Sequence, residues 1–394
     1  MRMRKVIIVV IVMGFMLSLS LPTLVAATAA NSAIELVESG EAAILIEATT
    51  GTVLYEKNAN VELEPASMTK MMAMYLVLEA ITNGQLAWDK LVSVSEHAAS
   101  LGGTQIFLEP GEQMSVSDLF KSVAIASAND ATTALGEVLA GSEEAFVNLM
   151  NERALEFGML KTTFKNPTGL PEAGHLTTAS DMAILAQRLI MDFPEITEFT
   201  ATYEDYVRQA SDEPFWLVNT NKLIRYVAGV DGLKTGFTSS AGYCLAATAK
   251  RDEMRVIAVV MGAESSVLRN KEVTLLIEHA FSQYELHQVV EAGSVVGTYK
   301  NLLVAGHEFE IVTTSAVNLL TKVGTLRGNE SQELVLNQEI ALPIKPGDVI
   351  GSLVYYVDEK PYQEVTLTVS EPVERTTLIA LFMEIVSRLL VGAH

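Results

Sequence analysis

The sequence predicts an α+β domain with an antiparallel sheet flanked by helices, then a small all-β domain and a C-terminal amphipathic helix. Three observations lead to this expectation. Strand-like runs begin and end the first 285 residues, and helical periodicities lie between them. Short β-rich runs follow, and the last residues are apolar at a helical period. Strands from the two ends of a domain can combine in one sheet, which leaves the intervening helices to cover it.

Residues 30–285 carry the α+β pattern. Two strand-like runs are expected to pair as a hairpin around a Thr-Thr-Gly turn: 42–47 and 52–55. Helical periodicity follows in five segments: 65–82, 116–127, 129–140, 143–157 and 178–191. Two apolar runs then predict strands and a periodic segment predicts a helix: 242–249, 255–262 and 269–284.

Residues 286–374 are predicted to form a small β-sandwich-like domain. Its short β-rich runs alternate with Gly, Asn and Asp turns: 294–299, 308–313, 316–320, 333–336, 351–357 and 364–370. This part of the sequence contains no recognisable catalytic constellation.

Residues 375–394 are predicted to form an amphipathic helix. Apolar residues recur there near a 3.6-residue period: Leu378, Leu381, Phe382, Ile385, Leu389 and Leu390. The segment is too short and too polar to span a bilayer. From the residues alone it could lie in the membrane interface, or it could pack on its own domain.

Residues 1–29 are predicted to be a secretory signal peptide. Three basic residues precede an uncharged apolar run from 6 to 21, and Ala27-Thr28-Ala29 supplies a small-x-small cleavage site. An uncleaved N-terminal anchor is the alternative, because the apolar run is slightly long. The chain is therefore expected to be exported.

Charge and metal-ligand residues exclude several classes of function. The whole chain has a net charge of −21. Residues 1–29 hold three basic and no acidic residues, so the mature chain would carry 24 basic and 48 acidic residues, a net charge of −24. Such a surface repels nucleic acid, and no nucleic-acid partner is expected. A single cysteine excludes an intramolecular disulfide, and the six scattered histidines predict no metal site and no cofactor.

Three short motifs occur in order along the chain: Ser67-Met68-Thr69-Lys70, Ser127-Ala128-Asn129 and Lys234-Thr235-Gly236. Their first residues are separated by 60 and 107 positions. Each string alone is common, so the ordered set carries the information. Together these residue types form a serine acyl-transfer site.

The first motif offers a nucleophile and its base. A serine hydroxyl is a weak nucleophile until a nearby base removes its proton. Ser67 and Lys70, at i and i+3, share one helical face, so the amine can reach the hydroxyl. Lysine acts as a base when burial and a neighbouring cation lower its pKa, and Lys234 could be that cation. Placing Ser67 in the first helical turn directs free N–H groups at a developing oxyanion.

The second motif lies between two helical segments. A hydroxyl and an amide two residues apart, Ser127 and Asn129, can face one cleft as a proton relay and a substrate-amide contact. Capping of the following helix is the alternative.

The third motif is expected to start a strand that continues through Phe237 towards Leu245. The cation of Lys234 and the hydroxyl of Thr235 suit a carboxylate ligand, and Gly236 lets a substrate backbone approach closely. An ordinary β-turn cation is the alternative.

Six segments together resemble low-molecular-weight penicillin-binding proteins, and more closely serine-type D-alanyl-D-alanine carboxypeptidases. They are Glu64–Met72, Phe107–Glu112, Ile125–Ala131, Asn166–Leu170, Asn219–Leu223 and Val230–Gly242. The likeness covers nearly all of the chain. It implies a penicillin-binding-protein/β-lactamase-like transpeptidase domain, with the C-terminal helix attaching the enzyme to the outer face of the cytoplasmic membrane.

The resemblance implies a two-step acyl transfer on a peptidoglycan stem pentapeptide. Ser67 would attack the carbonyl of the penultimate D-alanine, with Lys70 as base. Ser127, hydrogen-bonded between Lys70 and Lys234, would pass the proton to the leaving D-alanine. Water would then hydrolyse the acyl-enzyme.

The resemblance also implies how the substrate is held. Asn129 would bind the substrate amide, and Lys234 and Thr235 would receive the terminal carboxylate. Backbone N–H groups of Ser67 and Phe237 would form the oxyanion hole. A β-lactam antibiotic would acylate Ser67 and act as a covalent inhibitor, because its strained amide mimics the same dipeptide.

The chain departs from the family pattern at two positions. Ala128 stands where relatives often have Gly. Glu264 stands where some relatives carry an Arg that binds the carboxylate, and Arg269 is not expected to replace it safely. Cys244 is expected to be a small core residue. No role is assigned to His175.

Other functions share the same motifs. A β-lactamase would need a deacylating segment such as Glu-x-x-Leu-Asn, and the sequence has none between the second and third motifs. A transpeptidase or D,D-endopeptidase differs only in cleft shape. A non-catalytic cell-wall scaffold is the remaining alternative, and the intact nucleophile, base and cation argue against it.

Overall fold

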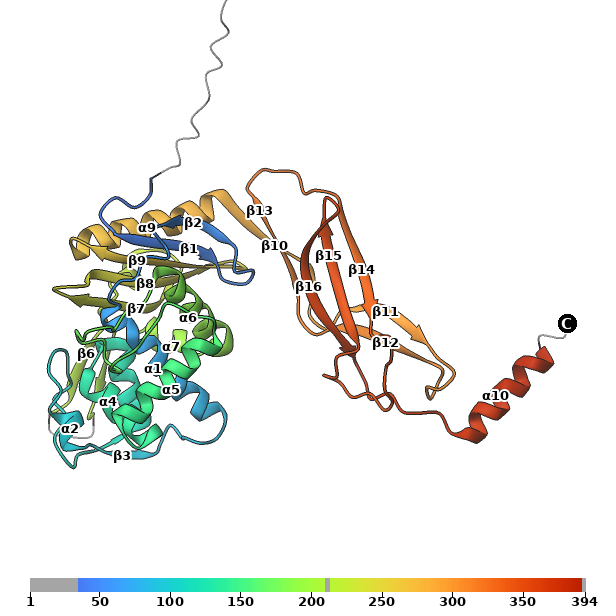
Figure 1. Cartoon of the computed structure of the whole chain (residues 1–394), viewed down its shortest axis with the longest axis horizontal. Helices are drawn as coiled ribbons and strands as arrows, with labels where there is room; N and C mark the ends of the chain where they lie inside the picture. Colours follow the sequence, from blue (N-terminus) through green and yellow to red (C-terminus); the bar gives the residue numbers. More distant parts are fainter. Residues whose placement is uncertain (1–34, 210–212, 392–394) are drawn as a thin grey trace, which may run out of the picture. The chain divides into compact units, whose positions relative to one another are not determined.

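A computed structural model of the chain describes residues 35–209 and 213–391 (Figure 1). The predicted signal peptide, 1–29, lies outside the described residues. The predicted α+β fold class is confirmed, as is the all-β domain that follows it. The predicted domain limits at 30–285, 286–374 and 375–394 stay predictions.

The first domain is built on a five-stranded sheet in the order β2-β1-β9-β8-β7, with all neighbours antiparallel. Strands from both ends of the domain meet in it, since Ile44 pairs with Val259. The strands are β1 (Ala42–Glu47), β2 (Val53–Lys57), β7 (Val230–Thr238), β8 (Gly242–Arg251) and β9 (Met254–Ala263).

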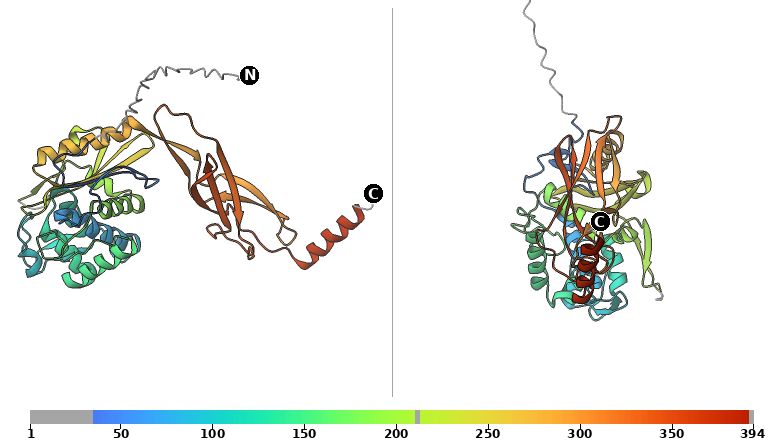
Figure 2. Two further views of the ribbon diagram at one scale, coloured as in Figure 1. Left: turned by 45° about the horizontal axis from the view of Figure 1, so that its top comes forward. Right: turned by 90° about the vertical axis from the view of Figure 1, so that its right-hand side faces the viewer.

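Both faces of this sheet are covered (Figures 1 and 2). Side chains alternate between faces along a strand. On β9, Ile257 and Val259 belong to the core shared with the helical layer, whereas Ala258 and Val260 belong to the core under α9 (Ser266–Gln283). This double coverage explains the nearly uninterrupted apolar runs of β8 and β9.

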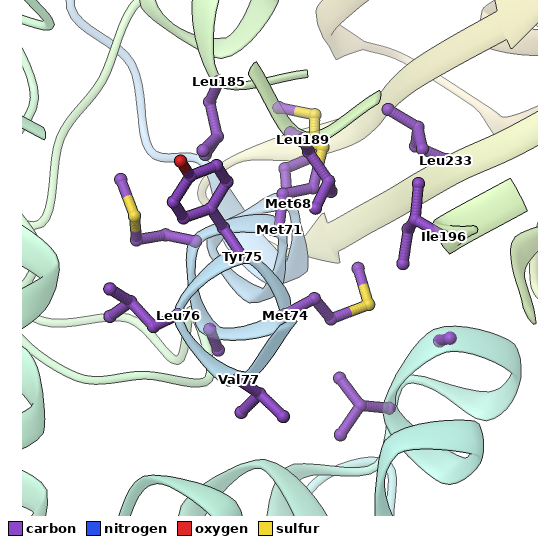
Figure 3. Close-up of a cluster of buried hydrophobic side chains, with 14 of the residues drawn as sticks. Met68, Met71, Met74, Tyr75, Leu76, Val77, Leu185, Leu189, Ile196 and Leu233 are labelled. Atoms are coloured by element: carbon purple, nitrogen blue, oxygen red, sulfur yellow. The ribbon is translucent and has the colours of Figure 1, made fainter. Parts of the chain in front are cut away.

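Helix α1 (Lys70–Thr82) lies at the centre of the helical layer, and ten of its 13 residues are buried. Figure 3 shows Met71, Met74 and Tyr75 of this helix among side chains of α6 and β7. A helix that is apolar all round is stable only inside a domain. The fold therefore holds the residues at the start of α1 rigidly. The helices around it are α2 (Glu96–Ala99), α3 (Val116–Lys121), α4 (Asn129–Ala140), α5 (Glu143–Glu156), α6 (Ala179–Asp192), α7 (Ile196–Thr200) and α8 (Leu223–Tyr226).

Two small hairpins were not predicted. Their strands are β3 (Leu91–Ser93) with β4 (Gln113–Ser115), and β5 (Glu204–Val207) with β6 (Phe215–Val218). Strands of three or four residues are too short to show a period-two pattern.

Two sequence-based boundaries were wrong. The strand predicted to run from Lys234 towards Leu245 is two strands, because β7 starts earlier at Val230 and ends at Thr238. The helix predicted over 116–127 stops at Lys121 and continues as a π-helical turn, η2 (Ser122–Ala126). This turn ends at Ser127, whose left-handed backbone (φ 67°) cannot continue a helix.

The β domain contains a five-stranded antiparallel sheet in the order β11-β12-β16-β15-β14 and a separate pair, β10 with β13. Its own apolar core includes Ile311, Leu353 and Leu367. The strands are β10 (Tyr284–Val290), β11 (Val295–Lys300), β12 (Glu308–Thr313), β13 (Val317–Lys322), β14 (Glu330–Leu336), β15 (Gly351–Val357) and β16 (Lys360–Val369).

The last described segment forms α10 (Leu378–Val391). It exposes several large apolar side chains: Leu378, Ile379, Phe382, Met383 and Ile385. Within the described ranges, every helix is too short or too polar to cross a membrane.

Candidate active site

The first motif lies where a 3₁₀ turn, η1 (Ala66–Thr69), leads into α1. The Nζ atom of Lys70 lies 3.1 Å from the Oγ atom of Ser67. It also donates a 2.6 Å hydrogen bond to the carbonyl oxygen of Thr168. Lys70 is completely buried. The Thr168 carbonyl therefore holds the Lys70 amine close to the Ser67 hydroxyl.

The surroundings of Lys70 favour its neutral form. Burial lowers its pKa well below the usual value, and the charge of Lys234 lowers it further. Asp130 acts in the opposite direction. Because desolvation and a like charge both disfavour the ammonium form, the net effect is an amine with a free lone pair. Such an amine can take the proton of Ser67.

The second motif lies at the junction of η2 and α4, where the charge of Asp130 acts on Lys70. Ser127 is buried at the end of η2, and Asn129 begins α4. The Asn129 side chain donates to the carbonyl oxygen of Gly102 at 2.7 Å, and its backbone N–H donates to that of Thr104 at 2.7 Å. Among the described residues, the Ser127 hydroxyl has no hydrogen bond to either lysine. The bridging geometry implied by the family resemblance is therefore not formed here.

The third motif lies in the middle of β7. Lys234 Nζ donates to the carbonyl oxygen of Thr235 at 3.1 Å, and Thr235 Oγ1 donates to Thr220 Oγ1 at 2.7 Å. The backbone N–H of Thr220 in turn donates to Ile125 of η2 at 3.2 Å. These contacts join the strand that carries Lys234 to the segment that carries Ser127.

Arg269 is the site residue that sequence reasoning missed. It lies on α9, is only 5% exposed, and donates from Nη1 to the carbonyl oxygen of Cys244 at 3.3 Å. Burial and the charge of Arg269 together lower the pKa of Lys234 to about 7. The charge of Arg269 therefore acts on Lys234. Arg269 shares the buried stripe of α9 with the carboxylate Glu272, and charged residues at a stripe that is otherwise apolar were the available signal.

Gly236 and Phe237 follow Lys234 and Thr235 on the same strand. A Cβ at Gly236 would lie 2.9 Å from the carbonyl oxygen of Pro65 and 3.2 Å from the Ser67 nitrogen. The strand backbone therefore lies directly against η1. The ring of Phe237 is 53% exposed and packs in a tilted arrangement on the ring of Tyr243, with a centroid distance of 4.3 Å.

The loop around Gly169 also packs against η1. Asn166 Oδ1 accepts hydrogen bonds from the backbone N–H groups of Thr168 and Gly169 at 3.2 and 2.8 Å. This turn directs the Thr168 carbonyl at Lys70. Gly169 has φ +82°, and a Cβ there would overlap the Ala66 carbonyl.

Two further residues have no place in the chemistry. Cys244 is fully buried, and burial raises the pKa of its thiol to about 11, so it is an inert core residue. Glu264 donates its backbone N–H to Ser39 Oγ.

In the part of the chain that the structure describes, no three His, Cys, Asp or Glu side chains are grouped as metal ligands.

Comparison with known proteins identifies the family. A model described as D-alanyl-D-alanine carboxypeptidase matches residues 27–265. The chain belongs to this family. A second model, the penicillin-binding protein 5 C-terminal domain, matches residues 284–375. The chain is 44% identical to the D-alanyl-D-alanine carboxypeptidase DacF of Bacillus subtilis, over 94% of this chain and 95% of DacF. It is 33% identical to DacC of Escherichia coli, over 84% of this chain and 83% of DacC.

Solved structures give the same result. Penicillin binding protein 5 from Haemophilus influenzae superposes with a TM-score of 0.71 at 30% identity, covering 85% of this chain and 98% of that chain. Penicillin-binding protein D2 from Listeria monocytogenes, solved in its ampicillin-bound form, has a TM-score of 0.53 at 36% identity. That match covers 62% of this chain and 98% of the Listeria chain. The family resemblance expected from the motifs is confirmed.

Gly169→Ala is expected to disable the site, whereas Gly174→Ala in the same loop is not. Both glycines have positive φ, so each alanine costs about 1–2 kcal/mol of backbone strain. Only at Gly169 does the added Cβ meet backbone, at the residue before Ser67. Labelling by a fluorescent penicillin should slow more than roughly tenfold in Gly169→Ala, because small displacements of reacting groups are costly. Labelling of both variants at the wild-type rate would contradict this role for Gly169.

Proposed function

We propose that this chain is a serine-type D-alanyl-D-alanine carboxypeptidase that removes the terminal D-alanine from peptidoglycan stem pentapeptides. The observation that carries the proposal is the buried Lys70 amine, 3.1 Å from the Ser67 hydroxyl and depressed in pKa. Membership of the D-alanyl-D-alanine carboxypeptidase family supports it.

In the acylation step, neutral Lys70 takes the proton from Ser67 Oγ as that oxygen bonds to the carbonyl carbon of the penultimate D-alanine. The backbone N–H groups of Ser67 and Phe237 stabilise the resulting oxyanion. The C–N bond then breaks, and the proton passes from Lys70 through Ser127 to the amine of the departing D-alanine. A rotation of the Ser127 hydroxyl toward Lys70 would complete this path. Water releases the shortened peptide from Ser67.

Three cationic or hydroxyl groups select a substrate with a free carboxylate. Lys234 and Thr235 are adjacent on β7, and the buried guanidinium of Arg269 adds positive potential behind them. Asn129 holds the amide of the substrate backbone. Arg269 supplies the charge that an arginine at 264 provides in some relatives.

The Ser67→Ala variant should lose all covalent reactivity. Wild-type protein is expected to gain the mass of one benzylpenicillin and to release D-alanine from a peptide ending in D-alanyl-D-alanine. Ser67→Ala should do neither, because it lacks the nucleophile, while Ser282→Ala on the exposed end of α9 should match wild type. Intact-mass spectrometry and a D-alanine assay measure both. If wild-type protein forms no adduct and releases no D-alanine, the chain is not this enzyme.

The pH dependence of kcat/KM should be bell-shaped. On the acid side it falls as Lys70 becomes protonated and loses its lone pair. On the alkaline side it falls as pH rises through about 7, the lowered pKa of Lys234, because only the ammonium form attracts the carboxylate. kcat/KM reports ionisations of the free enzyme. kcat should fall less above that pH, since a bound carboxylate keeps Lys234 protonated.

Steady-state kinetics across pH measure both parameters. The matched control is the same peptide with an amidated C-terminus, whose slower turnover should lack the alkaline limb. An alkaline limb with the same midpoint for both peptides would assign it to a group other than Lys234.

We infer that the enzyme acts outside the cytoplasm and is attached to the outer face of the cytoplasmic membrane through α10. The predicted signal peptide and a peptidoglycan substrate support export. The exposed apolar side chains of α10 support attachment, because a helix with such a face can lie in the membrane interface.

Deleting residues 376–394 should move the protein from the membrane fraction to the soluble fraction. The full-length double variant Phe382→Glu, Ile385→Glu should be released as well, because two charges on the apolar face oppose insertion. Phe382→Leu, Ile385→Leu should remain bound. Fractionation followed by immunoblotting gives the distribution. Unchanged partitioning of the deletion would place the attachment elsewhere in the chain.

A further inference from the structure

His175 is a buried histidine that the proposed chemistry does not use. It is 2% exposed and precedes α6. Its Nδ1 atom accepts a hydrogen bond from the backbone N–H of Lys165 at 3.3 Å. Because a backbone N–H can only donate, Nδ1 carries the lone pair and Nε2 carries the proton. Burial lowers the pKa of His175 to about 4, so the ring is neutral at physiological pH.

The Nε2 proton is directed at the first motif. His175 Nε2 lies 2.9 Å from Thr69 Oγ1, and it donates to that oxygen. The Thr69 hydroxyl in turn donates to the carbonyl oxygen of Ala66 at 2.8 Å. A chain of hydrogen bonds thus runs from the Lys165 backbone through His175 and Thr69 to Ala66.

The Ala66 carbonyl belongs to the peptide unit that contains the Ser67 N–H. This peptide bond is trans, so its C=O and N–H point in opposite directions. Ser67 is the second residue of η1, and its N–H has no acceptor within the turn. Ala66 also has φ +46°, which is unfavourable for alanine and requires support from its surroundings. Holding the Ala66 oxygen therefore sets the direction of the Ser67 N–H.

We propose that His175 is a positioning residue that acts through Thr69 and Ala66 to aim the Ser67 N–H at the oxyanion formed during acyl transfer. The proposal rests on the proposed function, in which Ser67 is the nucleophile and its N–H an oxyanion donor. A histidine that only filled the core would contribute to stability and leave the chemical step unchanged once the protein is folded.

The test uses two pairs of matched variants in the full chain. His175→Leu and Thr69→Val break the hydrogen-bond chain while keeping volume. His175→Gln keeps an N–H donor, and Thr69→Ser keeps the hydroxyl. We expect kcat for a peptide ending in D-alanyl-D-alanine to fall about tenfold in the Leu and Val variants. Complete loss of an oxyanion donor costs about 10²- to 10³-fold, and here the donor is misdirected rather than removed.

KM should change little, because the affected interaction forms only in the transition state. Gln and Ser variants should stay within about threefold of wild type, as expected where the donor or hydroxyl is retained. The double variant His175→Leu, Thr69→Val should lose no more than either single variant, since both break one chain. Concentrations are normalised to folded protein by circular dichroism and thermal melting, so that destabilisation does not count as lost chemistry.

A folded His175→Leu with wild-type kcat, a rise in KM at constant kcat, or additive losses in the double variant would each overturn the proposal. If His175→Leu does not fold, Thr69→Val and Thr69→Ser carry the same comparison. A wild-type enzyme that forms no acyl adduct would instead contradict the proposed function.

Discussion

The site depends on the burial of two lysines in one protein interior. Lys70 and Lys234 are both almost completely buried, and the charge of Lys234 adds to burial in lowering the pKa of Lys70. Burying two like charges together is costly, so one amine must give up its proton. The pKa of Lys70 is lowered further than that of Lys234, so Lys70 is the amine that loses its proton. The neutral amine that results lies next to Ser67. The base thus arises from the packing of the domain.

Three segments distant in sequence meet at one short turn. The start of α1, strand β7 and the loop around Gly169 are brought into backbone contact at Ala66 and Ser67. Gly236 and Gly169 both lie against that turn, and a side chain at either position would push it away. Because α1 is apolar on all sides, the turn rests on a rigid helix. The geometry of the nucleophile is therefore set by the core and by two glycines.

The sequence predicted the residues whose chemistry can be read from type and spacing, and missed those that depend on tertiary contact. Ser67 and Lys70 are three residues apart, so their meeting is a local property of a helix. Arg269 reaches Lys234 only because α9 folds back over the sheet. Ser127 ends its helix through a left-handed backbone that no periodicity reveals. The break between β7 and β8 follows from a turn in which Thr238 Oγ1 accepts from the Ala241 N–H.

The loop from 165 to 175 bears on the choice between a carboxypeptidase and a β-lactamase. A β-lactamase needs a group that activates water against the penicilloyl ester. Here the loop presents to the first motif a carbonyl from Thr168, a bare backbone at Gly169 and a neutral ring from His175. The carboxylate of Glu172 accepts a hydrogen bond from Asn166. This loop therefore orients Lys70 and the Ser67 turn for acylation and brings no carboxylate against them, which fits an enzyme that β-lactams acylate and block.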